Sequence, residues 1–409
     1  MRGWFRQATG GLPRQFWFLW IGTLINRLGS FVVIFLAIYL TGERHFSQSQ
    51  AGLVIGLYGV GGVLADRWGR RPTMLTAQFA AAGSMLTLGF AYAYWQILAV
   101  TFVLGVVTEA VRPAFSAMMV DIVPDHDRVR AYSLNYWAIN LGFALSAVGA
   151  GLAARADYLL LFVIDAGSTL ITALISLVFL AETRPVTGSP ADGARRQRGG
   201  LLTALRDRTF AIYLVISLGT VIVMMQHMST LPIAMTADGL SAATYGWVIA
   251  VNGVLIVLGQ LFVPRLIEGF DRSRVLALAA LIMGVGFGLV AFAGTAWFFA
   301  LTVVIWTVGE MLQSPSNAAT VAALSPAPLR GRYQGLNSLN WSAGTALAPV
   351  LGGFTQQHLG DAALWIGCFG VCALVAIGHL ITGPRRERRI EQLLATPAIT
   401  PATADRVGL

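Results

Sequence analysis

The sequence predicts an all-α membrane protein with twelve transmembrane helices arranged as two pseudo-symmetric six-helix bundles. Three observations support this fold class. First, 56% of the 409 residues are hydrophobic and only 11% are charged, whereas soluble domains carry roughly 25% charged residues. Second, the apolar residues form runs close to the length of about 20 residues that a bilayer span requires. Third, the two halves of the chain repeat one another.

Hydropathy places six expected spans in each half of the chain. They cover residues 16–40, 47–65, 72–93, 95–122, 128–154 and 158–181, and then 210–235, 241–264, 272–293, 296–323, 328–354 and 361–383. These lengths are typical of bilayer-spanning helices. A segment rich in glycine, proline and arginine separates the halves and is typical of a linker. The expected domains are an N-terminal bundle (1–182), a cytoplasmic linker (183–209), a C-terminal bundle (210–384) and a cytoplasmic tail (385–409).

Arginine placement predicts the orientation of the chain. All 28 basic residues are arginines, because the sequence contains no lysine. Arg27 and Arg112 lie within spans, Arg44 and Arg155 lie in loops of the outer side, and the other 24 lie in the tails or in loops of the opposite side. Cytoplasmic loops carry the excess of basic residues. We therefore expect a multi-pass protein of the cell inner (cytoplasmic) membrane with both termini in the cytoplasm.

Composition also excludes several function classes. The net charge of +9 is accounted for by arginines that face anionic lipids next to the membrane, so no nucleic-acid partner is expected. Without lysine there is no P-loop, and neither an HExxH nor a GxSxG motif is present, so we expect no enzyme and no cofactor. Cys368 and Cys372 lie in one apolar stretch and are expected to be small buried side chains, with no metal site.

The internal repeat indicates a transport path between the two halves. At an offset of 202 residues, Arg128, Arg130, Leu134, Asn135 and Gly142 align with Arg330, Arg332, Leu336, Asn337 and Gly344. One residue out of that register, Glu109 aligns with Glu310. In transporters built from two repeated bundles, the substrate site lies between the repeats near the middle of the membrane. This organisation predicts a small-molecule substrate, and a monomer is sufficient for it.

The first expected cytoplasmic loop carries a specific motif. From Gly62 to Met74 it reads GVLADRWGRRPTM, which resembles the signature G-x-L-x-D-R-x-G-R-[RK] of the major facilitator superfamily. The resemblance implies a latch that joins the cytoplasmic ends of the two halves in the outward-facing state. Asp66 would then face the start of the helix near Leu329, and the arginines would pair with acidic groups of the other half. The residues of this gating motif are Gly62, Asp66, Arg67, Gly69, Arg70 and Arg71.

A closer resemblance links the chain to the lactococcal type of proton-coupled multidrug exporter. The matching segments are Ser116–Asp121, Leu134–Leu141, Val308–Met311, Ser314–Ser316 and Gly331–Gly335. The resemblance implies export of lipophilic, often cationic, compounds in exchange for protons by rocker-switch alternating access. It also implies that Glu310 binds cationic substrates and protons. The exporter has an acidic residue at the position that matches Asp121.

Two positions depart from that pattern. Asn135 stands where the exporter has its proton-linked aspartate in the fifth span, and asparagine cannot titrate. The seventh span reads MMQHM from Met224 to Met228, where the exporter carries a second acidic site. Proton coupling must therefore use other groups.

Ionisable residues inside spans are costly and are functional candidates. The candidates for proton and substrate coupling are Glu310, Glu109, Arg112, Asp121, Arg27 and His227. For Glu310 the alternative is a structural hydrogen bond. Glu109 and Arg112 form either a self-neutralising i,i+3 ion pair or a pair that opens when substrate or a proton binds. A lone histidine such as His227 is often satisfied by one hydrogen bond, although it can titrate near neutral pH.

Aromatic, methionine and amide side chains on the inner spans are candidates for a pocket that takes flat cations. These residues are Asn135, Tyr136, Trp137, Asn140, Met224, Met225, Gln226, Trp306, Asn337 and Trp341. Near span ends, Trp95, Trp297 and Trp365 are expected to be interface anchors. The alternatives to a drug exporter are a carrier for a single metabolite, such as a sugar, peptide or natural product, and a non-transporting membrane sensor.

Overall fold

The computed structural model describes residues 11–60, 70–124, 127–182, 202–260, 262–326 and 329–395, and within these ranges the chain is helical and has no β-strand. Nine helices in this part of the chain are long and apolar enough to cross a membrane. The remaining expected spans coincide with α4, α5 and α17, which are shorter or more polar than those nine. The expected all-helical membrane fold is confirmed.

In the described residues, the N-terminal bundle comprises seven α-helices and one π-helical turn. In chain order these are α2 (Arg14–Leu28), α3 (Val32–Ile38), η1 (Tyr39–Glu43), α4 (Gln48–Val60), α5 (Arg70–Gly89), α6 (Tyr94–Ile122), α7 (Arg128–Ala156) and α8 (Leu159–Phe179). The α2, α3 and η1 helices together form the first expected span. The remaining helices correspond to expected spans two to six.

The C-terminal bundle begins after a short helix in the expected linker. That short helix is α9 (Leu202–Leu205). The elements of the bundle are α10 (Arg208–Met224), α11 (Gln226–Ser229), α12 (Leu231–Ala237), α13 (Ala242–Gly259), α14 (Val263–Leu266), α15 (Arg272–Leu289), η4 (Val290–Phe292), α16 (Ala296–Leu324), α17 (Arg330–Leu359) and α18 (Asp361–Ala395). The α10, α11 and α12 helices together form the seventh expected span.

Polar residues at the helix starts explain several of these boundaries. The Asp207 carboxylate accepts hydrogen bonds from the backbone N–H groups of Thr209 and Phe210 at the start of α10. Ser241 caps α13, and Asp271 caps α15 through the Arg274 N–H at 2.7 Å. The first N–H groups of a helix have no partner within it, so such caps contribute about 1 kcal/mol each. They set where three spans of the C-terminal bundle begin.

The first span of each bundle is broken at equivalent positions. Helix α2 ends at Leu28, and the repeat offset of 202 residues matches this position with Thr230. Thr230 separates α11 from α12. Helices α10 and α11 are separated one turn earlier, at Met225. Broken helices that line a path through the membrane are common in transporters, because the freed backbone groups can be satisfied by neighbouring helices.

The two bundles meet along two glycine-lined helix pairs, α4 with α17 and α7 with α13. A Cβ atom added to Gly56 would lie 2.7 Å from the Ala346 carbonyl oxygen, and one added to Gly253 would lie 2.8 Å from the Ala144 Cβ. Such close approach of two backbones requires glycine. We call these contacts the outer seam. They involve residues 48–59, 144–151, 243–253 and 345–353, which form the parts of the four helices far from the linker.

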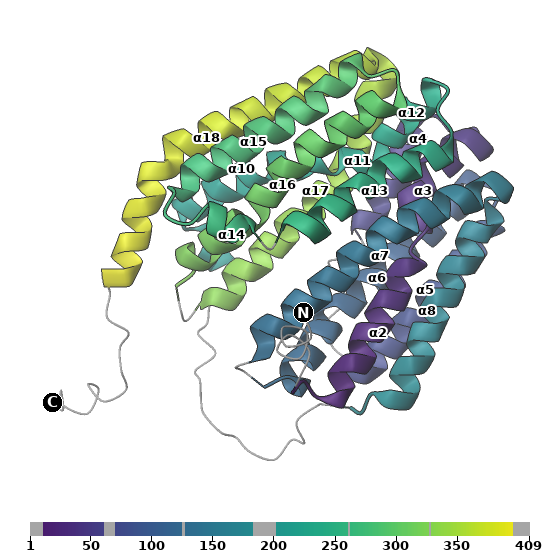
Figure 1. Ribbon diagram of the computed structural model, residues 1–409, viewed down its shortest axis with the longest axis horizontal. Coiled ribbons are helices and arrows are strands. Elements are labelled where there is room, and N and C mark those ends of the chain that lie inside the picture. The colour runs from purple at the N-terminus through teal and green to yellow at the C-terminus, as the bar shows by residue number, and fades with distance from the viewer. Residues whose placement is uncertain are drawn as a thin grey trace.

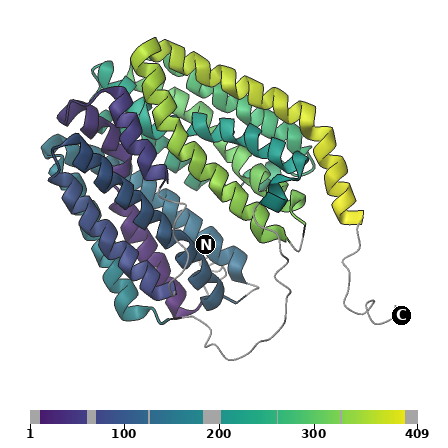
Figure 2. The ribbon, with the colours of Figure 1, turned by 180° about the vertical axis from the view of Figure 1, so that it is seen from behind.

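The bundles diverge from the outer seam toward the end of the molecule that carries the linker (Figure 1). The reverse view shows the same divergence (Figure 2). In agreement, Tyr136 and Trp137 on the linker side of α7 are 41% and 38% exposed. The two bundles are therefore packed together at the outer seam and spread apart toward the linker end.

The last helix is longer than expected. Helix α18 continues to Ala395, well past the expected end of the span at residue 383, so the expected tail begins as helix. Arg389 anchors this extension through its ion pair with Asp207 at 3.2 Å. One turn earlier, Arg386 is buried and donates hydrogen bonds to the His379 ring and carbonyl. The extension thus packs on its own bundle.

Trp365 lies in the core, although its position near a span end predicted an interface anchor. Trp95 and Trp297 are largely exposed, as expected of interface anchors, but Trp365 is only 1% exposed. It stacks on Phe287 inside the C-terminal bundle, because the start of α18 packs against α15. The expectation of an interface anchor is wrong for Trp365. The expectation that Cys368 and Cys372 are buried is confirmed.

Candidate functional site

Glu310 is held at the middle of the C-terminal bundle by a polar cluster. Its Oε2 accepts a hydrogen bond from the Asn252 amide of α13 at 2.8 Å, and the same amide nitrogen donates to Thr307 at 3.1 Å. Gly309 lets α16 approach α15, because a Cβ there would lie 2.7 Å from the Met283 nitrogen. This close packing sets the rotation of α16 and so the direction of the neighbouring Glu310 side chain. The cluster orients a half-buried carboxylate without neutralising it.

The N-terminal bundle contributes an aromatic surface to the same region. Tyr136 of α7 lies close enough to Glu310 to interact with it electrostatically, although the two residues belong to different halves. Beside it, Trp137 stacks on Trp20 of α2 with a ring separation of 6.4 Å. The Trp20 indole N–H donates to the Leu134 carbonyl and so fixes this ring against α7. Exposed aromatic faces next to a carboxylate provide an environment that attracts organic cations.

The three asparagines among the pocket candidates differ in their surroundings. Asn140 is half-buried and donates to the Tyr136 carbonyl at 2.9 Å. Asn135 is buried, and its Oδ1 has no hydrogen-bond partner among the described residues. Asn337 of α17 is half-buried. Four residues further along α17, Trp341 packs against the edge of the hydrophobic core.

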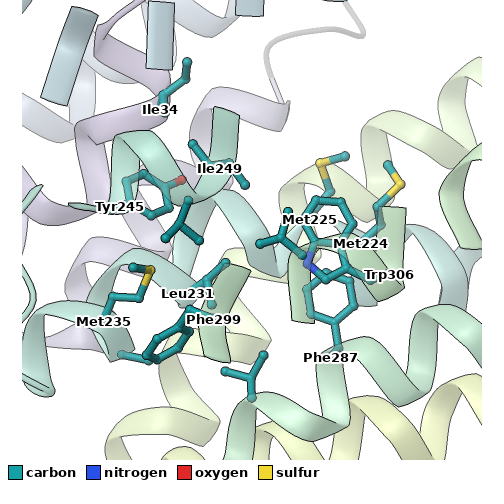
Figure 3. Packing of buried hydrophobic residues seen from close by; sticks show 14 of the residues in the cluster. Ile34, Met224, Met225, Leu231, Met235, Tyr245, Ile249, Phe287, Phe299 and Trp306 are labelled. Carbon is teal, nitrogen blue, oxygen red and sulfur yellow. The ribbon is translucent and has the colours of Figure 1, made fainter. Parts of the chain in front are cut away.

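The methionine candidates of the seventh span and Trp306 of α16 lie in packing contacts. Trp306 has no exposed surface and lies between His227 and Phe287, with ring separations of 5.5 and 5.3 Å. Figure 3 shows Trp306 over Phe287, with Met224 and Met225 beside them. All of these side chains are buried. In this conformation Met224, Met225, Phe287 and Trp306 pack in the hydrophobic core and do not line an open surface.

Gln226 and His227 bond to backbone carbonyl groups at the helix break and on the neighbouring helix α17. At the break, the Met228 N–H bonds to the Met225 carbonyl, and the Met224 carbonyl instead contacts His227 Nδ1 at 2.5 Å. The Gln226 amide donates to the Ala348 carbonyl of α17 at 2.9 Å. A histidine whose Nδ1 faces a carbonyl oxygen carries its proton on that nitrogen. This geometry favours the structural alternative for His227.

We expect the change His227→Phe to leave the pH profile of transport unaltered, because the ring contact with Trp306 is kept and only one hydrogen bond is lost. The free energy of unfolding should fall by about 1 kcal/mol, the usual value of one hydrogen bond. Transport rates across a pH series and denaturant unfolding of the purified protein test both expectations. A shifted pH profile would instead make His227 a titrating group of the cycle. His358→Phe, at an exposed histidine, is the matched control.

The charged candidates of the N-terminal bundle lie on two helices. Glu109 is half-buried on α6, on a stretch that packs closely on α4, since a Cβ on Gly105 would lie 2.8 Å from the Tyr58 Cα. Asp121 is exposed near the end of α6. Arg27 lies in the last turn of α2, where its backbone and Cβ pack on Gly142. The Arg112 side chain lies outside the described residues, so the exchange of Glu109 with Arg112 stays a prediction.

The gating motif lies largely outside the described residues. Gly62, Asp66, Arg67 and Gly69 fall between α4 and α5, and of Arg70 only the backbone at the start of α5 is described. Arg71 binds its own bundle, because its guanidinium donates to the Leu177 carbonyl and its backbone N–H to Glu182. The pairing of Arg71 with the other half is expected in the outward-facing state, so it stays a prediction.

Sequence reasoning missed two members of the Glu310 cluster. Asn252 and Thr307 are isolated polar residues within long apolar segments. Polar residues inside a span are costly unless they are paired, and this cost was the available signal. The sequence could not show that both face the same carboxylate.

Comparison with known proteins supports this architecture. The sequence model of the Major Facilitator Superfamily matches residues 19–237 and 216–404. The chain belongs to the major facilitator superfamily.

Members of the superfamily resemble this chain in both sequence and fold. The multidrug resistance proteins MdtH of Salmonella paratyphi B and Salmonella newport are 24% identical to it, over 91% of this chain and 96% of theirs. A POT family transporter solved with a thioalcohol-conjugated peptide superposes with a TM-score of 0.78 at 14% identity, covering 93% of this chain and 98% of its own. The nucleoside transporter NupG superposes with a TM-score of 0.75 at 12% identity, covering 90% and 99%. This chain is therefore a multi-pass membrane transporter of that fold.

Proposed function

We propose that this major facilitator protein exports lipophilic, often cationic, compounds across a bacterial inner membrane in exchange for protons. The observation that carries the proposal is the half-buried Glu310 carboxylate, which Asn252 orients and which lies close enough to Tyr136 of the other bundle to interact with it electrostatically. A carboxylate in this position can hold either a proton or a cationic substrate, so the two compete for one charge. Competition of this kind is the basis of exchange.

The arrangement of the halves supports an alternating-access cycle. The closed outer seam and the open linker end correspond to an inward-facing state, if the linker and both termini lie in the cytoplasm as the arginine distribution predicts. A compound would enter from the linker side and displace the proton from Glu310. Rocking of the bundles about the midplane would then open the outer seam, and the gating motif would latch the linker end. The name of the MdtH relatives is consistent with export of drugs.

Proton release from the purified protein tests this proposal. A panel of lipophilic cations and neutral metabolites is added to the wild type and to Glu310→Gln in weakly buffered detergent solution, and pH is recorded. We expect several unrelated cations to release protons from the wild type and none from the variant. Binding of a single compound without proton release, unchanged in the variant, would overturn the proposal in favour of a narrow-specificity carrier. Glu268→Gln, at an exposed carboxylate of the same bundle, is the control.

A further inference from the structure

A buried polar stripe on α8 faces the first span. It contains Asp165, Ser168, Thr169, Thr172 and Ser176, all buried. Thr172 donates to the Gly22 carbonyl of α2 at 3.1 Å, and Thr169 accepts a hydrogen bond from Asn26 of α2 at 2.9 Å. Hydrogen bonds of this kind join helices within a membrane. Asp165 is the one ionisable residue in the α8 sequence.

Asp165 lies at the break of the first span. Its Oδ2 accepts the backbone N–H of Val32, the first residue of α3, at 3.0 Å. On the other side of the break, Gly29 lies so close to Ser168 that no Cβ would fit. The chain therefore crosses the face of α8 at Asp165 with no room for a side chain at Gly29. The carboxyl group replaces the intrahelical partner that the break removes from the Val32 N–H.

The carboxyl group is sealed and only partly satisfied. Asp165 is 1% exposed, and its Oδ1 has no hydrogen-bond partner among the described residues. An ionised carboxylate offers about four acceptor positions, whereas the backbone groups that interact with this one are those of Val32 and Phe31. Burying a charge with so few partners is costly. The nearest compensating charge is Arg27 of α2, which interacts with Asp165 electrostatically. Helix α3 has no ionisable residue, and α5 has only Arg70 and Arg71 at its linker end. Helix α7, which also packs on α8, carries the titratable or charged residues Arg128, Arg130, Tyr132, Tyr136 and Arg155.

The equivalent break in the other bundle is bonded by side-chain amides. There, Gln226 bonds to the Ala348 carbonyl, and the Gln356 amide donates to the Thr230 carbonyl at 3.3 Å. Two titratable groups lie beside these amides: His227, whose Nδ1 contacts the Met224 carbonyl at 2.5 Å, and Asp361, which accepts a hydrogen bond from the Gln356 amide at 2.6 Å. The two breaks therefore differ, because a carboxyl group accepts the freed backbone N–H at the first break and an amide donates to the Thr230 carbonyl at the second. This asymmetry is unnecessary for packing, since the amides show that a neutral side chain can stabilise such a break.

We propose that Asp165 is a second proton-binding site of the transporter, at the break of the first span, with Arg27 as its exchangeable counter-ion. A proton adds to the free Oδ1, while Oδ2 continues to accept the Val32 N–H. The neutral acid no longer attracts the Arg27 guanidinium, which is released toward other partners. Because the carboxyl group is sealed in this state, the proton exchanges only when the break rearranges. This inference rests on proton-coupled transport, but it assigns a separate site.

Infrared difference spectroscopy of the full-length protein in nanodiscs tests the assignment. Spectra are recorded across a pH series, and the C=O band of protonated carboxyl groups is followed. We expect Asp165→Asn to lose one component of this band, and Asp157→Asn, at an exposed residue just before α8, to keep it. In Arg27→Gln the same component should persist to higher pH, because a neighbouring positive charge favours the ionised form. An unchanged band in Asp165→Asn would overturn the proposal.

Transport in proteoliposomes separates this site from Glu310. With tetraphenylphosphonium as the probe, Asp165→Asn should lose about tenfold or more of the transport driven by a pH gradient and keep counterflow, which needs no net proton movement. If Asp165→Asn does not fold, Asp165→Glu must show a shifted band. Failure of Glu310→Gln to alter proton release would overturn the proposed coupling at Glu310, whereas the infrared component tests Asp165 in either case. Full pH-driven transport by a folded Asp165→Asn would overturn the second site.

Discussion

Replacing Gly56 by leucine should hold the outer seam open and abolish most transport. A Cβ at this position would already lie 2.7 Å from the Ala346 carbonyl oxygen, and leucine adds three more carbon atoms. Overpacking of a tight contact costs roughly 1–3 kcal/mol. That cost falls only on the closed seam, so it shifts the equilibrium between the two conformations by roughly 5- to 150-fold. We expect transport to fall by about tenfold or more.

Distance measurements between spin labels on the two sides of the outer seam check this expectation. Suitable positions are Gln50 on α4 and His358 on α17, both exposed, in a background in which Cys368 and Cys372 are replaced by alanine. The Gly56→Leu variant should show longer distances than its parent. Gly83→Leu is the matched control, since nothing lies within 4 Å of a Cβ at that glycine. Unchanged distances in Gly56→Leu would show that the seam is not a closing surface.

The second large effect concerns Glu310→Gln. Glutamine keeps the shape of the side chain and an oxygen that can accept from Asn252, but it carries no titratable proton. We therefore expect transport driven by a pH gradient to fall by about tenfold or more, which corresponds to a loss of about 1.4 kcal/mol of coupling. Counterflow of a lipophilic cation should persist at a reduced affinity, because the negative charge is also gone.

Parallel assays in proteoliposomes separate coupling from folding. Counterflow by Glu310→Gln shows that the variant is folded and can complete the substrate-loaded half of the cycle. Asn252→Leu keeps the carboxylate but removes its amide partner, and it should weaken substrate binding while coupling survives. If Glu310→Gln transported at the wild-type rate under a pH gradient, the coupling proton would belong to another residue.

The overall architecture was predictable because its physical causes are local in sequence. Three patterns can be recognised without knowing which helices pack together: apolar runs of span length, a one-sided arginine distribution and a repeat offset of 202 residues. They predicted the helical membrane fold. The motif that begins at Gly62 identified the superfamily, and Glu310 was found because a carboxylate within an apolar run is costly.

The contacts between spans were not predictable, because hydropathy does not show which way a helix face points. The positions of Asn252 and Thr307 in the sequence did not indicate a shared partner. The packing of α13 on α16 brings both side chains to the Glu310 cluster. The same limitation misplaced Trp365, which lies near a span end in sequence but faces α15 in space. Arg71 was expected to reach the other half, a pairing that depends on the conformation of the two bundles.

The break in the first span shows most clearly which features the sequence determines and which depend on the tertiary structure. Gly29 was visible in the sequence, but an isolated glycine is tolerated within a helix, so it did not predict an interruption. Asp165 was visible as a charge near the start of the sixth span. The packing of α2 and α3 on α8 brings the Asp165 carboxyl group to the backbone that the break at Gly29 frees, with Arg27 nearby. A residue's chemistry is present in the chain, whereas its partner is chosen when the helices pack.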